Sequence, residues 1–363
     1  MPLPFKQPPL SLCLLRLSAI GDICHMLPIV HTLQKSWPTT QLSWVIGKNE
    51  YELVKDLKKI NFIIFDKSNE LKSYWHLYKQ LKAMRFDALL HMQMSFRTSL
   101  ISLLVKADIK LGFDKQRAKD YQWLFTNKKI SYQPRQHVID SLFGFTETLG
   151  IKQHCYEWQL AVHSNELDHV LKKANLSLDY KKPYVVISPC SSMAYRNWDS
   201  QSYAAVADYI QENYHIPVVL SGGHSDIEKQ MGQTIAQHSK HPLINLIART
   251  NLTQLTGLLG NALCLISPDS GPAHIATAVN TPVIGLYACT NPDRARPYLS
   301  QFLVVNRYPD AILKKYNKSV DQVKWGTRVK DEWAMKLISV EDVFEKFDKL
   351  MQASTKTNTK RVL

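Results

Sequence analysis

Residues 11–28 read SLCLLRLSAIGDICHMLP, an apolar run followed by a turn and a segment of helical pattern. The run has the length and apolar character of a buried strand in a parallel sheet. Ligands bind at the carboxyl ends of such strands, so Asp22, directly after the run, is a candidate functional residue. Gly21 beside it is expected to allow a tight or left-handed turn.

The same unit of apolar run and helix recurs along the chain. Further runs lie at 41–47, 60–66, 86–92, 107–113, 183–190, 217–223, 243–248, 262–268 and 282–288, with helix-length amphipathic segments between them. This alternation is typical of a parallel sheet with helices on both faces. Because the pattern lapses between 114 and 180, we predict an α/β fold of two Rossmann-like, doubly wound domains.

The polar segment SLDYKKP, 177–183, is the expected domain boundary. It divides the chain into a first domain, 1–178, and a second domain, 179–338. A helix is predicted over 339–352, and the polar residues 353–363 are predicted to be disordered.

The composition indicates an anionic partner. The chain has 45 basic and 31 acidic residues, a net charge of +14 that is spread over both halves. There is no basic arm or aromatic-basic repeat, so nucleic acid is not indicated as a partner. The six cysteines form no CxxC pair and no apolar run reaches about 18 residues, which favours a cytoplasmic protein with reduced thiols and no membrane-spanning helix.

Two further strand ends carry polar side chains. CSSMAYRNW, 190–198, brings Ser191, Ser192 and Arg196 after the first strand of the second domain, where they would hold phosphate oxygens or form a solvated loop. SPDSGPAHIATA, 267–278, ends a strand at Asp269 and begins a helix with free amides beside Ser270, Gly271 and His274. This turn is either an anion site or only a well-capped helix.

Asp22 itself allows two interpretations. Aspartate often caps a helix, but Pro28, which is most comfortable in a first helical turn, would then lie in the second turn. Alternatively, a carboxylate at a strand end accepts a proton from an attacking hydroxyl. The residues alone leave both open.

Three stretches together resemble the bacterial lipopolysaccharide heptosyltransferases, glycosyltransferase family 9, which use ADP-heptose to build the inner core. They are LRLSAIGDICHMLPIV at 15–30, SSMAYRNW at 191–198 and SPDSGPAHIATAVNTPVIGLYACTNPDR at 267–294. The resemblance runs in order from about residue 11 to 350. One departure is GGHSD at 222–226, where family members often place a glutamate for the nucleoside.

The resemblance implies a glycosyltransferase fold of the B type (GT-B), with two Rossmann-like domains facing a cleft and the helix 339–352 returning to the N-terminal domain. It implies acceptor binding by 1–178, nucleotide-sugar binding by 179–338, and inversion at the anomeric carbon. Asp22 becomes the catalytic base, with Ser18 and Gly21 on the acceptor side. The donor ligands become Ser191, Ser192, Arg196, Asp269, Ser270, Gly271 and His274, with Asp269 expected at sugar hydroxyls.

The implied acceptor is an anionic Kdo-lipid A precursor at the cytoplasmic face of the inner membrane. Arg97, Lys115 and Arg117 follow the fourth and fifth strands and are either acceptor ligands or solvated loop residues. None of the 20 aspartates lies two positions from another, so no DxD metal motif is present and we expect no metal or other cofactor. The charge predicts peripheral, salt-sensitive membrane association.

Other functions fit the same residues. They are a transferase for another nucleotide sugar, a nucleotide-sugar epimerase, and a non-catalytic nucleotide-sugar-binding protein. The stretches 285–298 and 307–326 look more like enzymes that add the first heptose than the second. The acceptor's phosphorylation, the oligomeric state and the hinge residues are not predicted.

Overall fold

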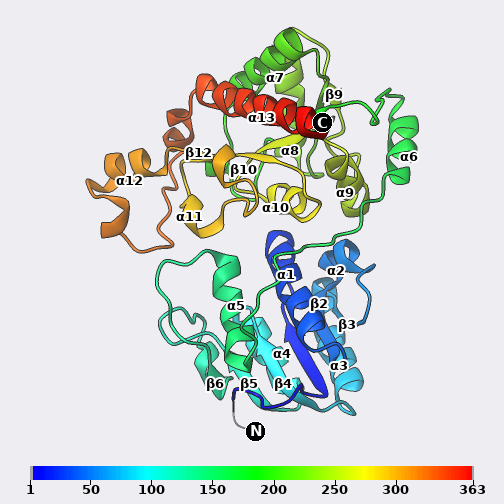
Figure 1. Cartoon of the computed structure of the whole chain (residues 1–363), viewed down its shortest axis with the longest axis vertical. Helices are drawn as coiled ribbons and strands as arrows, with labels where there is room; N and C mark the ends of the chain where they lie inside the picture. The colour runs from blue at the N-terminus through cyan, green and yellow to red at the C-terminus, as the bar shows by residue number, and fades with distance from the viewer. Residues whose placement is uncertain (1–2, 362–363) are drawn as a thin grey trace. The chain divides into compact units, whose positions relative to one another are not determined.

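The computed structural model describes residues 3–361, with side chains through residue 353. It divides into two compact units, Met1–Ala161 and Val162–Leu363 (Figure 1). This division precedes the expected boundary at 178/179. The reason is that α6 (Asn165–Ala174) packs against α9 (Leu252–Gly260), and Asn261 Nδ2 donates to Ser164 Oγ over 2.8 Å.

The first unit contains a six-stranded parallel sheet in the order β3-β2-β1-β4-β5-β6. The strands are β1 (Ser11–Leu15), β2 (Gln41–Gly47), β3 (Ile60–Phe65), β4 (Phe86–His91), β5 (Ala107–Gly112) and β6 (Lys128–Lys129). The helices are α1 (Ile20–Ser36), α2 (Lys48–Val54), α3 (Glu70–Leu81), α4 (Phe96–Leu104) and α5 (Val138–Leu149). The five predicted strands are confirmed, whereas β6 was not predicted because two lysines carry no apolar signal.

The second unit contains a second six-stranded parallel sheet, in the order β12-β11-β10-β7-β8-β9. Its strands are β7 (Val185–Ile187), β8 (Val218–Leu220), β9 (Ile244–Asn245), β10 (Cys264–Pro268), β11 (Val283–Tyr287) and β12 (Val305–Asn306). Besides α6 and α9, its helices are α7 (Ser200–Tyr214), α8 (Asp226–His238), α10 (Gly271–Ala278), α11 (Pro292–Ala295), α12 (Tyr308–Tyr316) and α13 (Val340–Arg361). The prediction of two doubly wound α/β sheets is confirmed.

Both sheets have the same strand order once each is counted from its own first strand. In each, the chain order reverses beside the first strand, between β1 and β4 in one unit and between β7 and β10 in the other. Ligands of open α/β sheets bind at this reversal, outside the carboxyl ends of the strands. The turns after these four strands are therefore where a site is expected.

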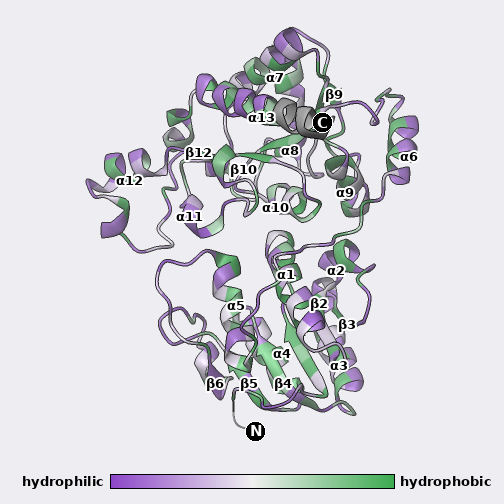
Figure 2. Ribbon diagram, in the orientation of Figure 1, coloured by the Kyte–Doolittle hydropathy of each residue, from purple (hydrophilic) through white to green (hydrophobic). Residues whose placement is uncertain are grey.

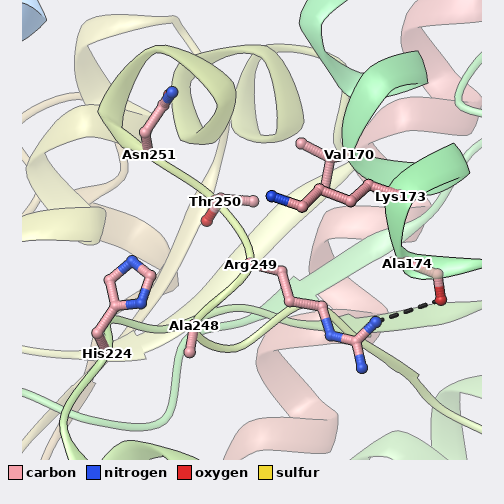
Figure 3. A pocket seen from close by; sticks show the side chains of 8 residues that line it. All are labelled: Val170, Lys173, Ala174, His224, Ala248, Arg249, Thr250 and Asn251. Carbon is pink, nitrogen blue, oxygen red and sulfur yellow. Dashed lines mark hydrogen bonds between the residues drawn. The ribbon is translucent and has the colours of Figure 1, made fainter.

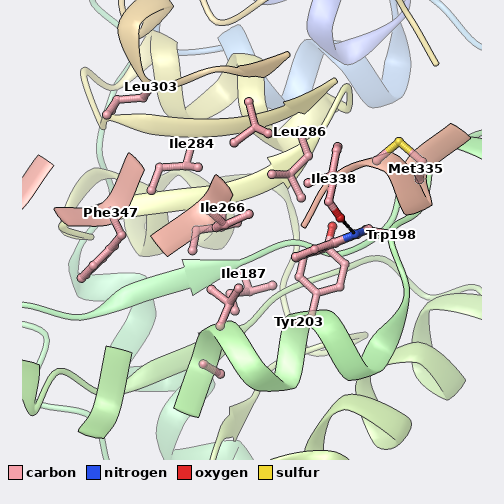
Figure 4. Packing of buried hydrophobic residues seen from close by; sticks show 14 of the residues in the cluster. Ile187, Trp198, Tyr203, Ile266, Ile284, Leu286, Leu303, Met335, Ile338 and Phe347 are labelled. Carbon is pink, nitrogen blue, oxygen red and sulfur yellow. Dashed lines mark hydrogen bonds between the residues drawn. The ribbon is translucent and has the colours of Figure 1, made fainter. Parts of the chain in front are cut away.

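The apolar strands carry the core of each unit, and Figure 2 shows them in green. In the first unit, α3 and α4 cover one face of the sheet, where Leu77 and Ile101 join a buried cluster with Leu15. In the second unit, the core includes Trp198, whose Nε1 donates to Ile338 O over 3.2 Å (Figure 4). All six cysteines are free and buried.

The last helix, α13, belongs to the core of the second unit through Val343, Phe347 and Leu350. The helix predicted over 339–352 is present, and its return to the N-terminal domain stays a prediction. It continues to Arg361, into the tail expected to be disordered, because 353–361 contains no proline or glycine to end it. Residues 362–363 of that tail lie outside the described residues. No helix in the described part of the chain is long and apolar enough to cross a membrane.

Candidate functional site

Asp22 lies in the first turn of α1, directly after β1. Its Oδ2 accepts a hydrogen bond of 3.2 Å from the backbone N–H of Ala19, the residue that precedes the helix. The capping interpretation is therefore correct in part. Of the tight or left-handed turn expected at Gly21, the left-handed alternative is wrong, because Gly21 is helical and Gly150 is the one glycine of positive φ in the described chain. Pro28 lies inside α1, so it does not delay the helix start.

The carboxylate of Asp22 is held by a buried arginine. Arg16 Nη2 lies 2.5 Å from Asp22 Oδ2, and Nδ1 of the buried His25 lies 3.8 Å from Oδ1. Burial acts to raise the pKa of Asp22, but the charge of Arg16 and the interaction with His25 outweigh it. The pKa of Asp22 is thus well below its ordinary value, and the group is a carboxylate at physiological pH.

Gln93, which follows β4, holds the turn that precedes Asp22. Its Oε1 accepts from the N–H groups of Leu17 at 2.7 Å and Ser18 at 3.2 Å, and its Nε2 lies 3.4 Å from Ser18 Oγ. Arg16 adds hydrogen bonds to Ser18 O, at 3.0 Å, and Met92 O, at 2.5 Å. The turns after β1 and β4 therefore form one hydrogen-bonded unit around Asp22.

The basic residues expected at the acceptor differ in their surroundings. Arg97 is exposed and pairs with Glu70 at 2.5 Å, and Lys115 is exposed. Arg117 is mostly buried and bonds to Asp114, Gln136, Ser141 and Ser131 O. Arg117 therefore organises the loop after β5, whereas Lys115 presents its charge to solvent.

In the second unit, the turn after β7 is folded by its own side chains. Ser191 N donates to Asn197 Oδ1 over 2.8 Å, and Ser191 Oγ donates to Met193 O over 2.9 Å. Ser192 is exposed, and Arg196 ends a short 3₁₀ helix, Ala194–Arg196. The Ser191 hydroxyl is thus part of the turn, while that of Ser192 is presented outward.

Arg196 bridges the turns after β7 and β10. Its Nη1 donates to Asp269 O over 3.1 Å and lies 3.2 Å from Asp269 Oδ2. Its Nε is buried and has no hydrogen-bond partner among the described residues. An unmet buried donor of a cation costs on the order of 1–3 kcal/mol, so this atom indicates a ligand or water position.

The turn after β10 leads into α10 with its amides uncapped. Ser270 precedes the helix, but its Oγ pairs with Ser267 Oγ at 2.7 Å and makes no capping bond to α10. The first N–H groups of the helix, from Gly271 on, therefore remain available to an anion. Nε2 of the buried His274 lies 3.9 Å from Asp269 Oδ1. Asp269 thus lies between a guanidinium and an imidazole.

A pocket of about 390 Å³ lies in the second unit, beside the turns that follow β8 and β9. Figure 3 shows its lining, which is Val170, Lys173 and Ala174 from α6 together with His224, Ala248, Arg249, Thr250 and Asn251. Apolar walls with a few polar groups are typical of small-molecule pockets, and this volume is within their usual range. Of the stretches singled out in the sequence, GGHSD at 222–226 contributes His224 to this pocket, and no pattern marked the residues of α6 or 248–251 as part of it.

The GGHSD segment takes its shape from a glutamate further along the chain. Glu228 reaches back from α8, where its carboxylate accepts from Gly223 N at 2.7 Å and from Ser225 Oγ at 2.6 Å. Glu228 therefore closes the turn as a capping residue, and His224 is the member of the segment that lines the pocket.

Comparison with known proteins identifies the family. Residues 74–324 match the model of glycosyltransferase family 9 (heptosyltransferase). The chain is 39% identical over 350 residues to the lipopolysaccharide core heptosyltransferase OpsX of Haemophilus influenzae, covering 96% of this chain and 99% of the relative. The chain belongs to glycosyltransferase family 9.

Solved structures of the family share its fold. A family 9 glycosyltransferase from Veillonella parvula superposes with a TM-score of 0.76, at 19% identity and with 94% of this chain and 97% of that chain covered. The ADP-heptose lipopolysaccharide heptosyltransferase II of Escherichia coli gives 0.73, at 18% identity, with 95% and 99% covered. The predicted family and fold are confirmed, and the chain is a glycosyltransferase.

The structure brings the predicted residues together in two groups, one in each unit. Asp22 and Ser18 share the β1 and β4 turns, and Arg196, Asp269 and His274 share the β7 and β10 turns. Sequence reasoning missed Arg16 and Gln93. A single arginine inside the apolar run 11–17 was a usable signal for Arg16, because a buried cation needs a partner.

Proposed function

We propose that the chain transfers heptose from ADP-heptose to a Kdo-bearing lipid A acceptor, by a single inverting displacement and with no metal ion. The proposal assigns acceptor activation to the first unit and donor binding to the second. The observation that carries it is that each unit has a suitable group where its strand order reverses. In the first unit this is the carboxylate of Asp22, held by Arg16, and in the second it is the turn of Arg196 beside the uncapped helix α10.

The acceptor hydroxyl gives its proton to Asp22 as its oxygen bonds to the anomeric carbon. Because the pKa of Asp22 is low, the carboxylate is a weak base, so the proton moves late, after bond formation has made the hydroxyl acidic. Oδ2 is occupied by Arg16 and Ala19, so Oδ1 is the oxygen assigned to the hydroxyl. Gln93 and Arg16 keep this turn in place.

The bond between the anomeric carbon and the β-phosphate oxygen breaks, and ADP leaves with the bonding electrons. In the proposal, its new charge is stabilised by Arg196 Nε, His274 and the amides of α10. These groups supply the positive field that other transferases obtain from a metal. Ser192 and Ser270 lie in the same turns and are assigned as further phosphate contacts.

The pocket beside α6 is assigned to the nucleoside. Val170, Ala174 and Ala248 offer apolar contacts, and Thr250 and Asn251 are among the polar groups of its lining. The donor turns lie after β7 and β10 and the pocket lies beside the turns after β8 and β9, so both belong to the carboxyl edge of one sheet. The resemblance at 285–298 and 307–326 supports transfer of the first heptose.

The test is ADP release from ADP-heptose by the purified chain, with and without Kdo-lipid A, together with the mass of the lipid product. We expect acceptor-dependent ADP release, a product heavier by one heptose, and unchanged rates with a chelator. UDP- and GDP-sugars are used as control donors in the same assay. Sugar conversion without an acceptor would indicate an epimerase, and donor binding without turnover would indicate a binding protein.

A further inference from the structure

Helix α3 carries both buried and exposed apolar side chains, on two sides of the helix. Leu77 and Leu81 are buried against the first sheet, whereas Leu71, Trp75 and Tyr78 are 87%, 58% and 52% exposed. The exposed three are spaced by four and three residues, so they form one stripe along the helix. The outer face of a helix in a soluble protein is normally polar, so this stripe needs an explanation.

The neighbouring helix α4 repeats this arrangement. Phe96 and Leu103 are more than half exposed and lie seven residues apart on one face, while Ile101 is buried in the same cluster as Leu77. The two helices pack on the same face of the sheet, and Arg97 of α4 pairs with Glu70 of α3 at 2.5 Å. We call the exposed apolar side chains of these two contacting helices the apolar face: Leu71, Trp75, Tyr78, Phe96 and Leu103.

The turn 121–124 adds exposed apolar side chains near α4 and is anchored by a buried side chain. The buried side chain of Gln122 donates to His91 O over 2.8 Å and accepts from Phe113 N over 3.1 Å. This anchor holds Tyr121, Trp123 and Leu124 outward, all of them exposed. The rings of Phe96 and Phe125 lie 6.4 Å apart, which connects the turn to the apolar face.

Exposed basic residues lie on or near the same segments of the chain. Lys79 Nζ lies 3.4 Å from the centre of the Trp75 ring, and further exposed lysines on the same segments are Lys72, Lys82, Lys119, Lys128 and Lys129. Of the neighbouring acidic residues, Glu70 is already paired with Arg97, and Asp120, directly before the turn, is exposed. Apolar and aromatic side chains framed by lysines are the features of a protein surface that lies in the headgroup region of an anionic bilayer.

We propose that the apolar face and the turn 121–124 dock on an anionic lipid bilayer, with α3 and α4 lying in the plane of its surface. This inference rests on the proposed function, since the acceptor is a lipid that must be reached within a membrane. Phe96 lies three residues after Gln93, which holds the turn of Asp22. Docking here therefore brings the carboxyl edge that carries Asp22 to the bilayer surface.

A second copy of the chain is a poorer occupant of this surface. A symmetric dimer would place the same patch against itself, and its lysines would then oppose one another. An anionic bilayer complements these charges and accepts the tryptophan and tyrosine rings at its interface.

The experiment is flotation of the full chain with vesicles of phosphatidylethanolamine and phosphatidylglycerol, and with phosphatidylcholine vesicles. We expect binding to the anionic vesicles, weakened but not abolished by raised salt. The triple variant Leu71→Ser, Trp75→Ser, Leu103→Ser should bind them about tenfold more weakly, because it exposes less apolar area. The matched control is Ile227→Ser, Phe302→Ser, Leu313→Ser, whose side chains in the second unit are also more than half exposed and which should bind like the wild type.

Two further readouts separate this proposal from the proposed function. With a deacylated, water-soluble acceptor, the triple variant should retain wild-type transfer and melting temperature. Loss of vesicle binding in the triple variant supports docking even if the wild type transfers no heptose, in which case the proposed function fails alone. Unchanged vesicle binding by a folded triple variant would overturn the docking proposal, as would a wild-type dimer that this variant dissociates without weakening vesicle binding.

Discussion

The buried Arg16 and the partly exposed Asp22 form a contact of 2.5 Å between Nη2 and Oδ2, after the end of β1. The same guanidinium donates to Ser18 O and to Met92 O after β4. One cation therefore ties both strand ends at the reversal point to the carboxylate. It fixes the position of Asp22 and keeps the group ionised.

Replacing Arg16 by methionine should raise the pKa of Asp22. Burial raises the pKa of Asp22, and without Arg16 it would be opposed mainly by His25 and the Ala19 amide. Activity depends on the carboxylate form, so the acid limb of the profile of kcat against pH should move toward neutral pH. Arg85→Met, which removes an exposed arginine paired with Asp108, is the control. An acid limb at the same pH in wild type and Arg16→Met would contradict this role.

Replacing Arg196 by methionine should weaken ADP binding by about tenfold or more, the effect of losing a charge-assisted hydrogen bond. The buried Nε has no partner in the described structure, so its donor is available to a phosphate. Calorimetric titration with ADP measures this change. Lys229→Met, on the exposed surface of α8, should bind ADP normally. An unchanged dissociation constant in Arg196→Met would remove Arg196 from the donor site.

Filling the pocket beside α6 should weaken the binding of ADP-heptose without affecting the binding of the acceptor. Ala174→Trp introduces a large ring at the pocket wall, so the KM for ADP-heptose should rise several-fold while the KM for the acceptor stays unchanged. Lys172→Trp, two residues earlier and exposed on the same helix, is the matched control. Equal donor KM values for the two variants would show that the nucleoside binds elsewhere.

Helix α13 should contribute to the stability of the second unit. Phe347 is fully buried in its core, so Phe347→Ala should lower the free energy of unfolding by about 3–5 kcal/mol. Glu345→Ala removes an exposed residue of the same helix and should change it by no more than about 0.5 kcal/mol. Urea titration of both variants measures this difference, and similar midpoints would show that α13 is only loosely attached.

The sequence predicted the strands because buried parallel strands are continuous apolar runs, as at 11–17 and 282–288. It placed Asp22, Arg196 and His274 at strand ends, which is where the structure has them. The repeat of strand and helix is local in the chain, so residue order alone indicates it. The two lysines of β6 carry no such signal, because that strand forms only through pairing with Leu111 and Gly112.

Other features depend on contacts between distant residues. The pocket combines α6 with turns 50 or more residues later, and no local pattern indicates that these segments meet. The side chain of Gln93 holds the Ser18 turn across 75 positions. The expected boundary at 178/179 missed that α6 packs on α9, because a polar, proline-containing segment marks a loop but not which unit the preceding helix joins.

The central claim is that Asp22 is the base of a heptose transfer. Its test is ADP release from ADP-heptose by wild type and Asp22→Asn, with and without Kdo-lipid A, alongside ADP affinity and melting temperature. We predict that acceptor-dependent release is lost in Asp22→Asn while ADP affinity and folding persist. Wild-type activity in a folded Asp22→Asn variant would contradict the claim and leave Asp22 as a helix cap.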